Sequence, residues 1–495
     1  MSSLKKQGTK AFLWDFFGKI ARHGTTFIVT IVLARLLEPS DFGLIAMIMV
    51  IVMVALVFTD VGLGSALIQR RRLLPVHYAS VFYFNIFIGL LLTLITFLSA
   101  TWISVFYENK ALISITQVMA LLFIINAFSS VQISKLRKEL NYAALAKADV
   151  TAALLSGVIG ILLAFYDAGV WSLVVMALSR GIFYNIFVWG ASKWVPSLLF
   201  SFKALGQLWG FGFRMFLSNF IETVYTHLDI IIIGKIFSPA VLGFFDQAKR
   251  LNLMITQLSS GSIMAVLFPV LSKVQNDLPR FQNIVIKTLG IISFITFFLL
   301  GFMYLIAEEL IVLLFTEKWL TSAEYFKILV LSGFGYPISA LLVGILSSRG
   351  NSKAFLKVEI YKKILLSLNL YVGFLWGIEG YLYGLIVVTF LALSLNIAFA
   401  SQEIKLHFFV FVRPVLSQMA ISVFAVLITV LIYAGETSII ISMLIKGFVF
   451  TISYLFVSKL FKTSSYLYTM DQIVPLINRI VRKNTPVNIE NKGNE

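Results

Sequence analysis

The stretch Leu33 to Ala46 reads LARLLEPSDFGLIA, and the stretch 200 positions later, Ile233 to Asp246, reads IGKIFSPAVLGFFD. Both place a basic residue, a proline and a glycine in the same order, at Arg35, Pro39 and Gly43 in the first copy. Each lies between two long apolar runs, which is typical of a helix end, a short turn and a new helix start. The recurrence predicts that one helical unit is used twice.

Composition indicates an integral membrane protein. Hydrophobic residues make up 59% of the 495 residues and charged residues only 13%, with a mean hydropathy of +0.93, which leaves too little polar surface for a soluble globule. The formal charge of +17 does not indicate nucleic-acid binding, because the basic residues are distributed among short loops. The first 24 residues are interrupted by charges, so they predict a retained first span and not a signal peptide.

Turn signals and charges divide the chain into about fourteen apolar spans of roughly 20 residues, which predicts an all-α integral membrane fold of about 14 transmembrane helices. The segment from Ala307 to Trp319 is too short to cross alone and is predicted to be an interfacial helix. The predicted organisation is an N-lobe with spans 1–6 (1–195), a C-lobe with spans 7–12 (196–402), spans 13–14 (403–461) and a cytoplasmic tail (462–495).

Lysine and arginine counts over short loops predict the orientation. Basic residues are concentrated in the N-terminus, in alternate loops such as QRRRLLPVH (69–77), and in the tail after residue 458. The other loops hold only Arg35, Lys110, Lys235 and Lys318. Both termini are therefore predicted to be cytoplasmic.

The repeat extends beyond the opening pair. The further matches are FYENK (106–110) with FTEKW (315–319); Asn141, Ala144, Lys147 and Asp149 with Asn351, Ala354, Lys357 and Glu359; and Gly169 and Asn185 with Gly380 and Asn396. An even number of spans in each copy makes the copies parallel, with a site between them near the midplane and access that alternates by rocking. Chance similarity between apolar helices is the alternative interpretation.

Charged side chains inside spans point to the site, because such a residue costs roughly 2.5–3.5 kcal/mol at the bilayer centre and usually faces a bundle interior or cavity. Around residue 219, one helix face steps by three or four positions through the polar residues Arg214, Ser218, Glu222, Tyr225 and Asp229. A similar face in the first span holds Asp15, Lys19 and Arg22.

These faces predict a cationic cavity that holds an anionic headgroup, since the arginine fork donates two parallel hydrogen bonds to phosphate. The predicted substrate-binding residues are Arg22, Arg180, Arg214, Lys249 and Arg250, and the predicted acidic or ion-coupling residues are Asp15, Glu222 and Asp229. The alternative is structural pairing of these charges: Asp15 with Lys19 or Arg22, Glu222 with Arg214, and Asp246 with Lys249 or Arg250.

No catalytic constellation is recognisable. The chain has no cysteine, its four histidines are scattered, and its GLG and GFG stretches lie in or beside spans, where close helix packing is the ordinary use of glycine. The sequence therefore predicts no metal site, no cofactor and no enzymatic activity.

ARLLEPSDFGLIA (34–46), DVGLGSALIQRR (60–71) and ISVFYEN (103–109) resemble the polysaccharide transporter branch of the MOP flippase superfamily, the Wzx-type exporters. The resemblance implies a fourteen-helix, two-lobe fold of the MOP/MATE type, located in the bacterial cytoplasmic membrane. It implies that the protein moves an undecaprenyl-diphosphate-linked oligosaccharide from the cytoplasmic to the periplasmic leaflet. It also implies that cavity arginines and lysines hold the diphosphate or acidic sugars, that a proton or sodium gradient drives the cycle, and that a polysaccharide polymerase is a partner.

Two other functions remain open. A MATE-type drug or cation antiporter fits the fold, but an acidic or aromatic pocket would be expected there. A membrane polymerase or glycosyltransferase would need a sizeable extracytoplasmic loop or a DxD metal motif, and the chain has neither.

Overall fold

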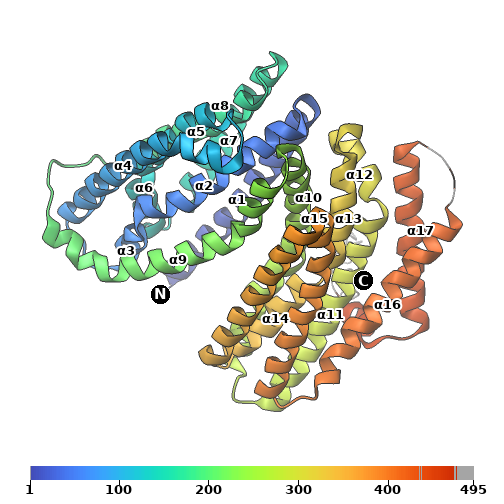
Figure 1. Cartoon of the computed structure of the whole chain (residues 1–495). Helices are drawn as coiled ribbons and strands as arrows, with labels where there is room; N and C mark the ends of the chain where they lie inside the picture. The colour runs from blue at the N-terminus through green and yellow to red at the C-terminus, as the bar shows by residue number, and fades with distance from the viewer. Residues whose placement is uncertain (1, 434, 436–437, 473–474, 476–495) are drawn as a thin grey trace, which may run out of the picture. The chain divides into compact units, whose positions relative to one another are not determined.

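The computed structural model describes residues 2–433, 435, 438–472 and 475 (Figure 1). Within these residues the chain is a series of helices joined by short turns, and no strand is formed. The helices are α1 (Ser2–Leu36), α2 (Pro39–Asp60), α3 (Leu63–Gln69), α4 (Pro75–Tyr107), α5 (Leu112–Met119), α6 (Leu121–Lys138), α7 (Tyr142–Phe165), α8 (Val170–Ser192), α9 (Phe202–Ile236), α10 (Pro239–Lys273), α11 (Leu278–Leu305), α12 (Ala307–Phe315), η1 (Glu317–Trp319), α13 (Leu320–Ser332), α14 (Gly335–Ser348), α15 (Ser352–Glu403), α16 (Phe408–Ile432) and α17 (Ile439–Leu460). Most of the predicted tail (462–495) lies outside the described residues.

Eleven spans of the described chain are long and apolar enough to cross a membrane. α1 and α10 are not among them; each has 35 residues and carries part of the charge identified in the sequence. α15 leaves helical geometry at Trp376 and Gly377, so two helices are joined there across a kink. The all-α membrane fold is confirmed, and the count of fourteen spans stays a prediction.

Local sequence explains where the helices begin. Pro39 and Pro239 are the first residues of α2 and α10, where a missing N–H costs no helical hydrogen bond. Asn141 caps α7 by accepting a hydrogen bond from the amide of Ala144 over 3.3 Å. Its repeat equivalent, Asn351, caps α15 in the same way, over 3.0 Å. Both matched pairs thus perform the same local task.

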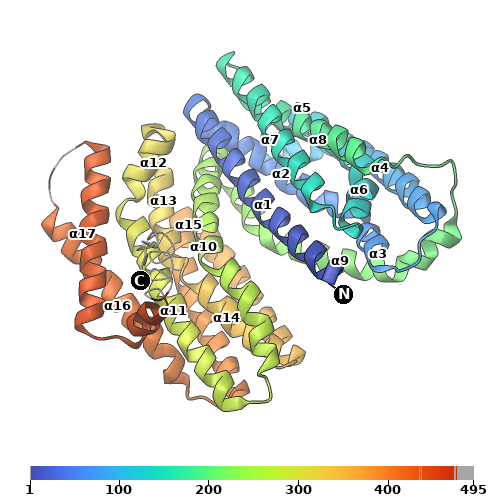
Figure 2. The same ribbon diagram turned by 180° about the vertical axis from the view of Figure 1, so that it is seen from behind.

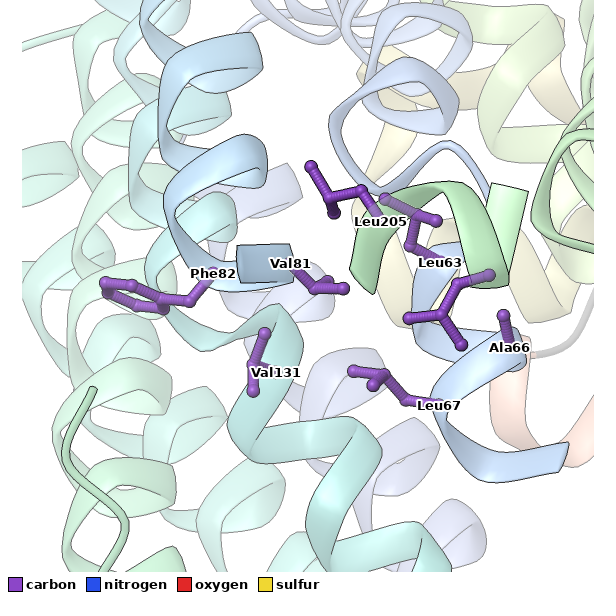
Figure 3. Close-up of a cluster of buried hydrophobic side chains, with 8 residues drawn as sticks. Leu63, Ala66, Leu67, Val81, Phe82, Val131 and Leu205 are labelled. Atoms are coloured by element: carbon purple, nitrogen blue, oxygen red, sulfur yellow. The ribbon is translucent and has the colours of Figure 1, made fainter. Parts of the chain in front are cut away.

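The chain forms two compact units. Unit 1 contains residues 1–246 and 314–319, and unit 2 contains residues 247–313 and 320–495. In unit 1, α7 packs against α1 and α8, and α9 packs mainly against α2, α3 and α4 (Figures 1 and 2). A buried apolar cluster joins α3, α4, α6 and α9 (Figure 3).

The core of unit 2 lies where α11 packs against α16 and α17. The buried hydroxyl of Tyr454 has two acceptors within hydrogen-bond distance of its single proton, the carbonyl oxygen of Phe294 at 2.8 Å and Oε1 of Gln418 at 2.9 Å. At the start of α12, Glu309 accepts hydrogen bonds from Lys446 and Ser442 of α17. These polar contacts fix the C-terminal helices to the core of unit 2.

Candidate functional site: two arginines on one carboxylate

Three helices of unit 1 position the charged residues of the site. α1 approaches α7 closely at Gly18, which faces Ala146, and Val29 of α1 faces Gly157 of α7; a Cβ on either glycine would clash with the facing side chain. Small residues are common at such contacts because they allow membrane helices to approach closely. α8 lies along the other side of α7 (Figures 1 and 2).

Arg22 of α1 and Arg180 of α8 converge on Asp149 of α7. Nε of Arg22 lies 3.3 Å from Oδ2 of Asp149, and Nη2 of Arg180 donates a hydrogen bond to Oδ1 over 3.0 Å. The three side chains are between 31% and 34% exposed, so the cluster is neither sealed nor fully solvated. Because two cations share one anion, the cluster keeps one net positive charge. We refer to these three residues as the Asp149 site.

Arg22 retains hydrogen-bonding capacity in this arrangement. Its Nε is buried and has no hydrogen-bond partner among the described residues, although it lies near the carboxylate. Its Nη2 lies 3.0 Å from Nε2 of His23. A guanidinium offers five N–H donors in a planar fork that matches carboxylate and phosphate oxygens. The Asp149 site is therefore suited to a further oxyanion.

Basic charge continues along α7 from the Asp149 site. Lys147 lies with its ammonium 5.7 Å from the ring centroid of Trp14 on α1. The same stretch of α7 faces α8 across a pocket of about 350 Å³. The pocket is lined by Asn141, Ala143, Ala144, Lys147, Ala148, Thr151, Phe187 and Ala191.

The structure places the other predicted residues apart from this cluster. Asp15 pairs with Lys19 over 2.7 Å, as the alternative interpretation predicted. Arg214 and Glu222 are both exposed on α9 and form no ion pair within the described part of the chain, so the predicted pairing of these two is wrong. Asp229 is buried near the end of α9.

Two predicted cations belong to the other unit. Lys249 is half-buried and Arg250 is exposed, both on the part of α10 that lies in unit 2. The structure thus brings two of the five predicted substrate-binding residues into one cluster, Arg22 and Arg180. Arg22 pairs with Asp149 and not with Asp15.

Sequence reasoning missed Asp149 as a site residue. It appeared only as a marker of the repeat, matched with Glu359. Its position between Lys147 and Thr151 on an otherwise apolar helix was a usable signal, because an isolated carboxylate inside a span needs a partner.

A second missed residue is Asp60, the last residue of α2. Its carboxylate accepts hydrogen bonds from the amide of Gly64 over 3.0 Å, from Oγ of Ser130 over 2.8 Å and from Nδ2 of Asn85 over 3.3 Å. These donors come from α3, α6 and α4, so one carboxylate connects four helices of unit 1. The sequence feature that could have identified Asp60 is its place at the start of DVGLGSALIQRR (60–71). That stretch was used only for the family resemblance.

The repeated turns contact each other within unit 1. A Cβ on Gly43 would clash with the carbonyl oxygen of Pro239, and a Cβ on Gly243 would clash with the carbonyl oxygen of Pro39. These are equivalent positions of the repeat, so the contact is reciprocal. Glycine is required at both positions because the opposing backbone occupies the space of a side chain.

Residues 314–319, which we call the strap, lie against the first of these turns. Nε of Arg35 donates a hydrogen bond to a strap carbonyl over 2.9 Å, and Nζ of Lys318 donates one to the carbonyl of Arg35 over 3.1 Å. Nε1 of the fully buried Trp319 donates a hydrogen bond to the carbonyl of Ala34 over 2.8 Å. The strap belongs to unit 1, whereas the residues before and after it belong to unit 2.

The fold and its embedded charges define a multi-pass membrane protein with the architecture of the MurJ and MATE transporters. The structure of "Lipid II flippase MurJ, inward closed conformation" matches with a TM-score of 0.69 at 16% identity, over 92% of this chain and 100% of that chain. An inward-facing multidrug resistance MATE family transporter of the MOP superfamily matches with a TM-score of 0.59 at 13% identity, over 78% and 98% of the two chains. The predicted MOP/MATE-like fold is confirmed.

The chain belongs to the family described as "Polysaccharide biosynthesis protein", whose model matches residues 32–324. It is similar to the lipopolysaccharide biosynthesis protein WzxC of Escherichia coli (strain K12), with 23% identity over 84% of this chain and 82% of that protein. It is also similar to the succinoglycan biosynthesis transport protein ExoT of Rhizobium meliloti (strain 1021), with 24% identity over 66% of each chain. The predicted family resemblance is therefore confirmed.

Proposed function

We propose that this protein is a flippase that moves an undecaprenyl-diphosphate-linked oligosaccharide across the bacterial cytoplasmic membrane for surface polysaccharide synthesis. The observation that carries the proposal is the pair Arg22 and Arg180, which meet on helices of a membrane protein in this family and keep a net positive charge. Membrane-embedded arginines are costly and usually mark a substrate pathway. A diphosphate is the part of such a lipid that two guanidinium groups would recognise.

The remaining parts of the proposal follow from the fold class and the charge distribution. Residues 1–195 and 196–402 act as parallel repeats between which the substrate moves by alternating access. Both termini are cytoplasmic, since the basic loops lie on that side. Arg214, Lys249 and Arg250 contribute to the substrate path, and Asp15, Glu222 and Asp229 are candidates for proton or sodium coupling. A polysaccharide polymerase receives the translocated lipid, and the flippase itself performs no chemical step.

The experiment uses the purified chain in proteoliposomes that contain an undecaprenyl-diphosphate-linked oligosaccharide with a fluorescent label on the sugar. Transfer between leaflets is measured by the loss of protection from a membrane-impermeant quencher. We expect transfer to need the protein and to fall at least tenfold in Arg180→Ala, because a charge-assisted contact contributes about 1.5–3 kcal/mol. Arg180→Lys should restore part of the rate, since it keeps the charge and loses the planar fork.

Two outcomes would assign a different function. Uptake of a cationic dye driven by an ion gradient, with no transfer of the labelled lipid, would assign a MATE-type antiporter, the function that the second structural match favours. Lengthening of the labelled sugar by the purified protein would assign a polymerase. Equal transfer in wild type and in empty liposomes would reject the flippase.

A further inference from the structure

We propose that Asp149 is a displaceable counter-anion: it holds Arg22 and Arg180 together before the substrate arrives and gives them up to the anionic group of the substrate. We call this replacement of Asp149 by the substrate anion the exchange, and it rests on the proposed function only for the identity of that anion. Its basis in the structure is that one carboxylate bridges two arginines from different helices. Asp149 would thereby set how tightly the site holds its substrate.

The bridge is made by single contacts that a better ligand can replace. Each oxygen of Asp149 faces one arginine, at 3.3 Å for Arg22 and 3.0 Å for Arg180, and the contact to Arg22 does not reach hydrogen-bond geometry. Within the described residues, no other carboxylate pairs with either arginine. A diphosphate carries more oxygens than a carboxylate and can bind each guanidinium in bidentate fashion.

The exchange avoids leaving a charge unpaired. Removing one partner of a partly buried ion pair is costly because the other charge stays desolvated, whereas replacing one anion by another leaves both arginines with an anionic partner. Each side chain of the Asp149 site is about a third exposed, so an incoming anion can reach it. Once displaced, Asp149 stays beside the bound anion, and the repulsion between like charges favours release.

The equivalent position of the second repeat has a different arrangement. Glu359 on α15 pairs with Lys362, which lies three residues further along the same helix. A pair within one helix is local and joins no second element. Asp149 therefore joins three helices, whereas Glu359 forms an ion pair within one helix. Glu359→Gln is a matched control for the loss of the Asp149 carboxylate.

The probe is inorganic pyrophosphate, titrated into the purified full-length protein in detergent and followed by calorimetry. We expect Asp149→Asn to bind pyrophosphate about tenfold more tightly than wild type, because the competing carboxylate charge is gone. Glu359→Gln should leave the affinity within about twofold. Glu139→Gln, which removes a carboxylate paired with Lys135 and does not touch the arginines, should also stay within about twofold and controls for general electrostatics.

A second measurement uses the wild-type protein and does not depend on the folding of a variant. Phenylglyoxal modifies accessible arginines, and mass spectrometry reports the extent at Arg22 and Arg180. Pyrophosphate should slow the modification of both residues together, with no effect on the exposed Arg280 of α11, which lies in unit 2. Failure to protect the two arginines overturns the exchange, as does unchanged or weaker pyrophosphate binding by a folded Asp149→Asn protein.

Transfer of the labelled lipid separates this inference from the proposed function. If Asp149 is exchanged for the substrate anion, Asp149→Asn should bind the substrate more tightly and turn it over several-fold more slowly. If Asp149 has only a structural role, the same variant should have lower membrane abundance and an unchanged turnover for each folded molecule. Normal lipid transfer by the wild type, without tighter pyrophosphate binding by Asp149→Asn and without protection of the two arginines, rejects the exchange but not the flippase. The pyrophosphate effects without lipid transfer reject the flippase and keep the exchange.

Discussion

The indole Nε1 of Trp319 donates a hydrogen bond to the carbonyl oxygen of Ala34 over 2.8 Å, although the two residues lie 285 positions apart in the chain. The ring is fully buried and packs edge-on against Phe42, with the ring centroids 5.3 Å apart. Trp319 therefore contributes both a hydrogen bond and apolar packing to the strap, beside the two hydrogen bonds that join the strap to Arg35.

Changing Trp319 should separate these two contributions. Trp319→Phe loses the hydrogen bond and should lower the free energy of unfolding by about 1 kcal/mol. Trp319→Ala also leaves a cavity and should cost about 3–5 kcal/mol. Thermal unfolding in detergent measures both, and Trp102→Ala, at a tryptophan that is 75% exposed on α4, serves as the control. Equal losses at positions 319 and 102 would contradict the buried contact.

The reciprocal turn contact predicts that neither glycine accepts a methyl group. Gly43→Ala and Gly243→Ala should each lower folded protein in the membrane, because a Cβ would overlap an opposing carbonyl oxygen. Gly24→Ala is the matched control: no atom lies within 4 Å of its Cβ position, so the change should stabilise α1 by about 0.5–1 kcal/mol. Fluorescence-detected size exclusion reports the folded amount. Folded levels of the Gly43 and Gly243 variants that match Gly24→Ala would show that the turns do not touch.

Replacement of Asp60 should destabilise unit 1. Asp60→Ala leaves the amide of Gly64 and the hydroxyl of Ser130 without this acceptor and removes one of the two acceptors of Asn85 Nδ2. Each unsatisfied buried group costs about 1–3 kcal/mol. Glu139→Gln removes a carboxylate from an exposed pair with Lys135 and should change stability by less than about 1 kcal/mol. The measurement is again thermal unfolding in detergent, and similar midpoints for the two variants would refute the role of Asp60.

Arg214 and Glu222 provide a test of the predicted cavity on α9. Because the structure shows no ion pair between them, Arg214→Ala should keep near-normal membrane abundance. If Arg214 lines the substrate path, transfer of labelled lipid should fall, and adding Glu222→Ala should not restore it. Recovery of abundance and transfer in the double variant would instead establish a structural pair.

One exposed pair predicts a pH dependence. The hydrogen bond and charge of Lys235 lower the pKa of the Glu108 carboxyl below its usual value of 4.5. A carboxyl whose pKa is lowered on folding stabilises the protein above its unfolded pKa, and this contribution disappears as the pH falls through the folded pKa. Wild type should therefore exceed Glu108→Gln in thermal stability at pH 7, with the difference shrinking below about pH 4.5. A difference that is constant or grows on acidification would contradict the ion pair.

The helical architecture was predictable from apolar segment length and from the residues that begin and end helices. Pro39 and Asn141 act on the helix that each of them begins, so their roles can be predicted from neighbouring residues in the sequence. The matching residues Pro239 and Asn351 are predicted to have the same roles. Membership in the polysaccharide family was also recognisable from the stretches around the first turn.

The site was only partly predictable. Helical spacing identified Arg22 as a residue inside a span, but spacing along one helix carries no information about which residue on another helix it meets. Asp149 is 127 positions from Arg22, and their meeting depends on the packing of α1 against α7 at Gly18 and Gly157. The proposed pairing of Arg214 with Glu222 failed because two positions eight residues apart are too distant for one side-chain contact along a helix.

The contact between Pro39 and Gly243, mirrored by that between Pro239 and Gly43, has the form of an isologous interface, in which residue i meets j and j meets i. Such a contact is what two identical subunits related by a twofold axis would form. Each predicted six-helix repeat would therefore carry, in a single proline–glycine turn, the surface it needs to dock onto its own copy. A gene encoding one repeat could supply a homodimer, and fusion of two such genes would preserve that joint inside one polypeptide.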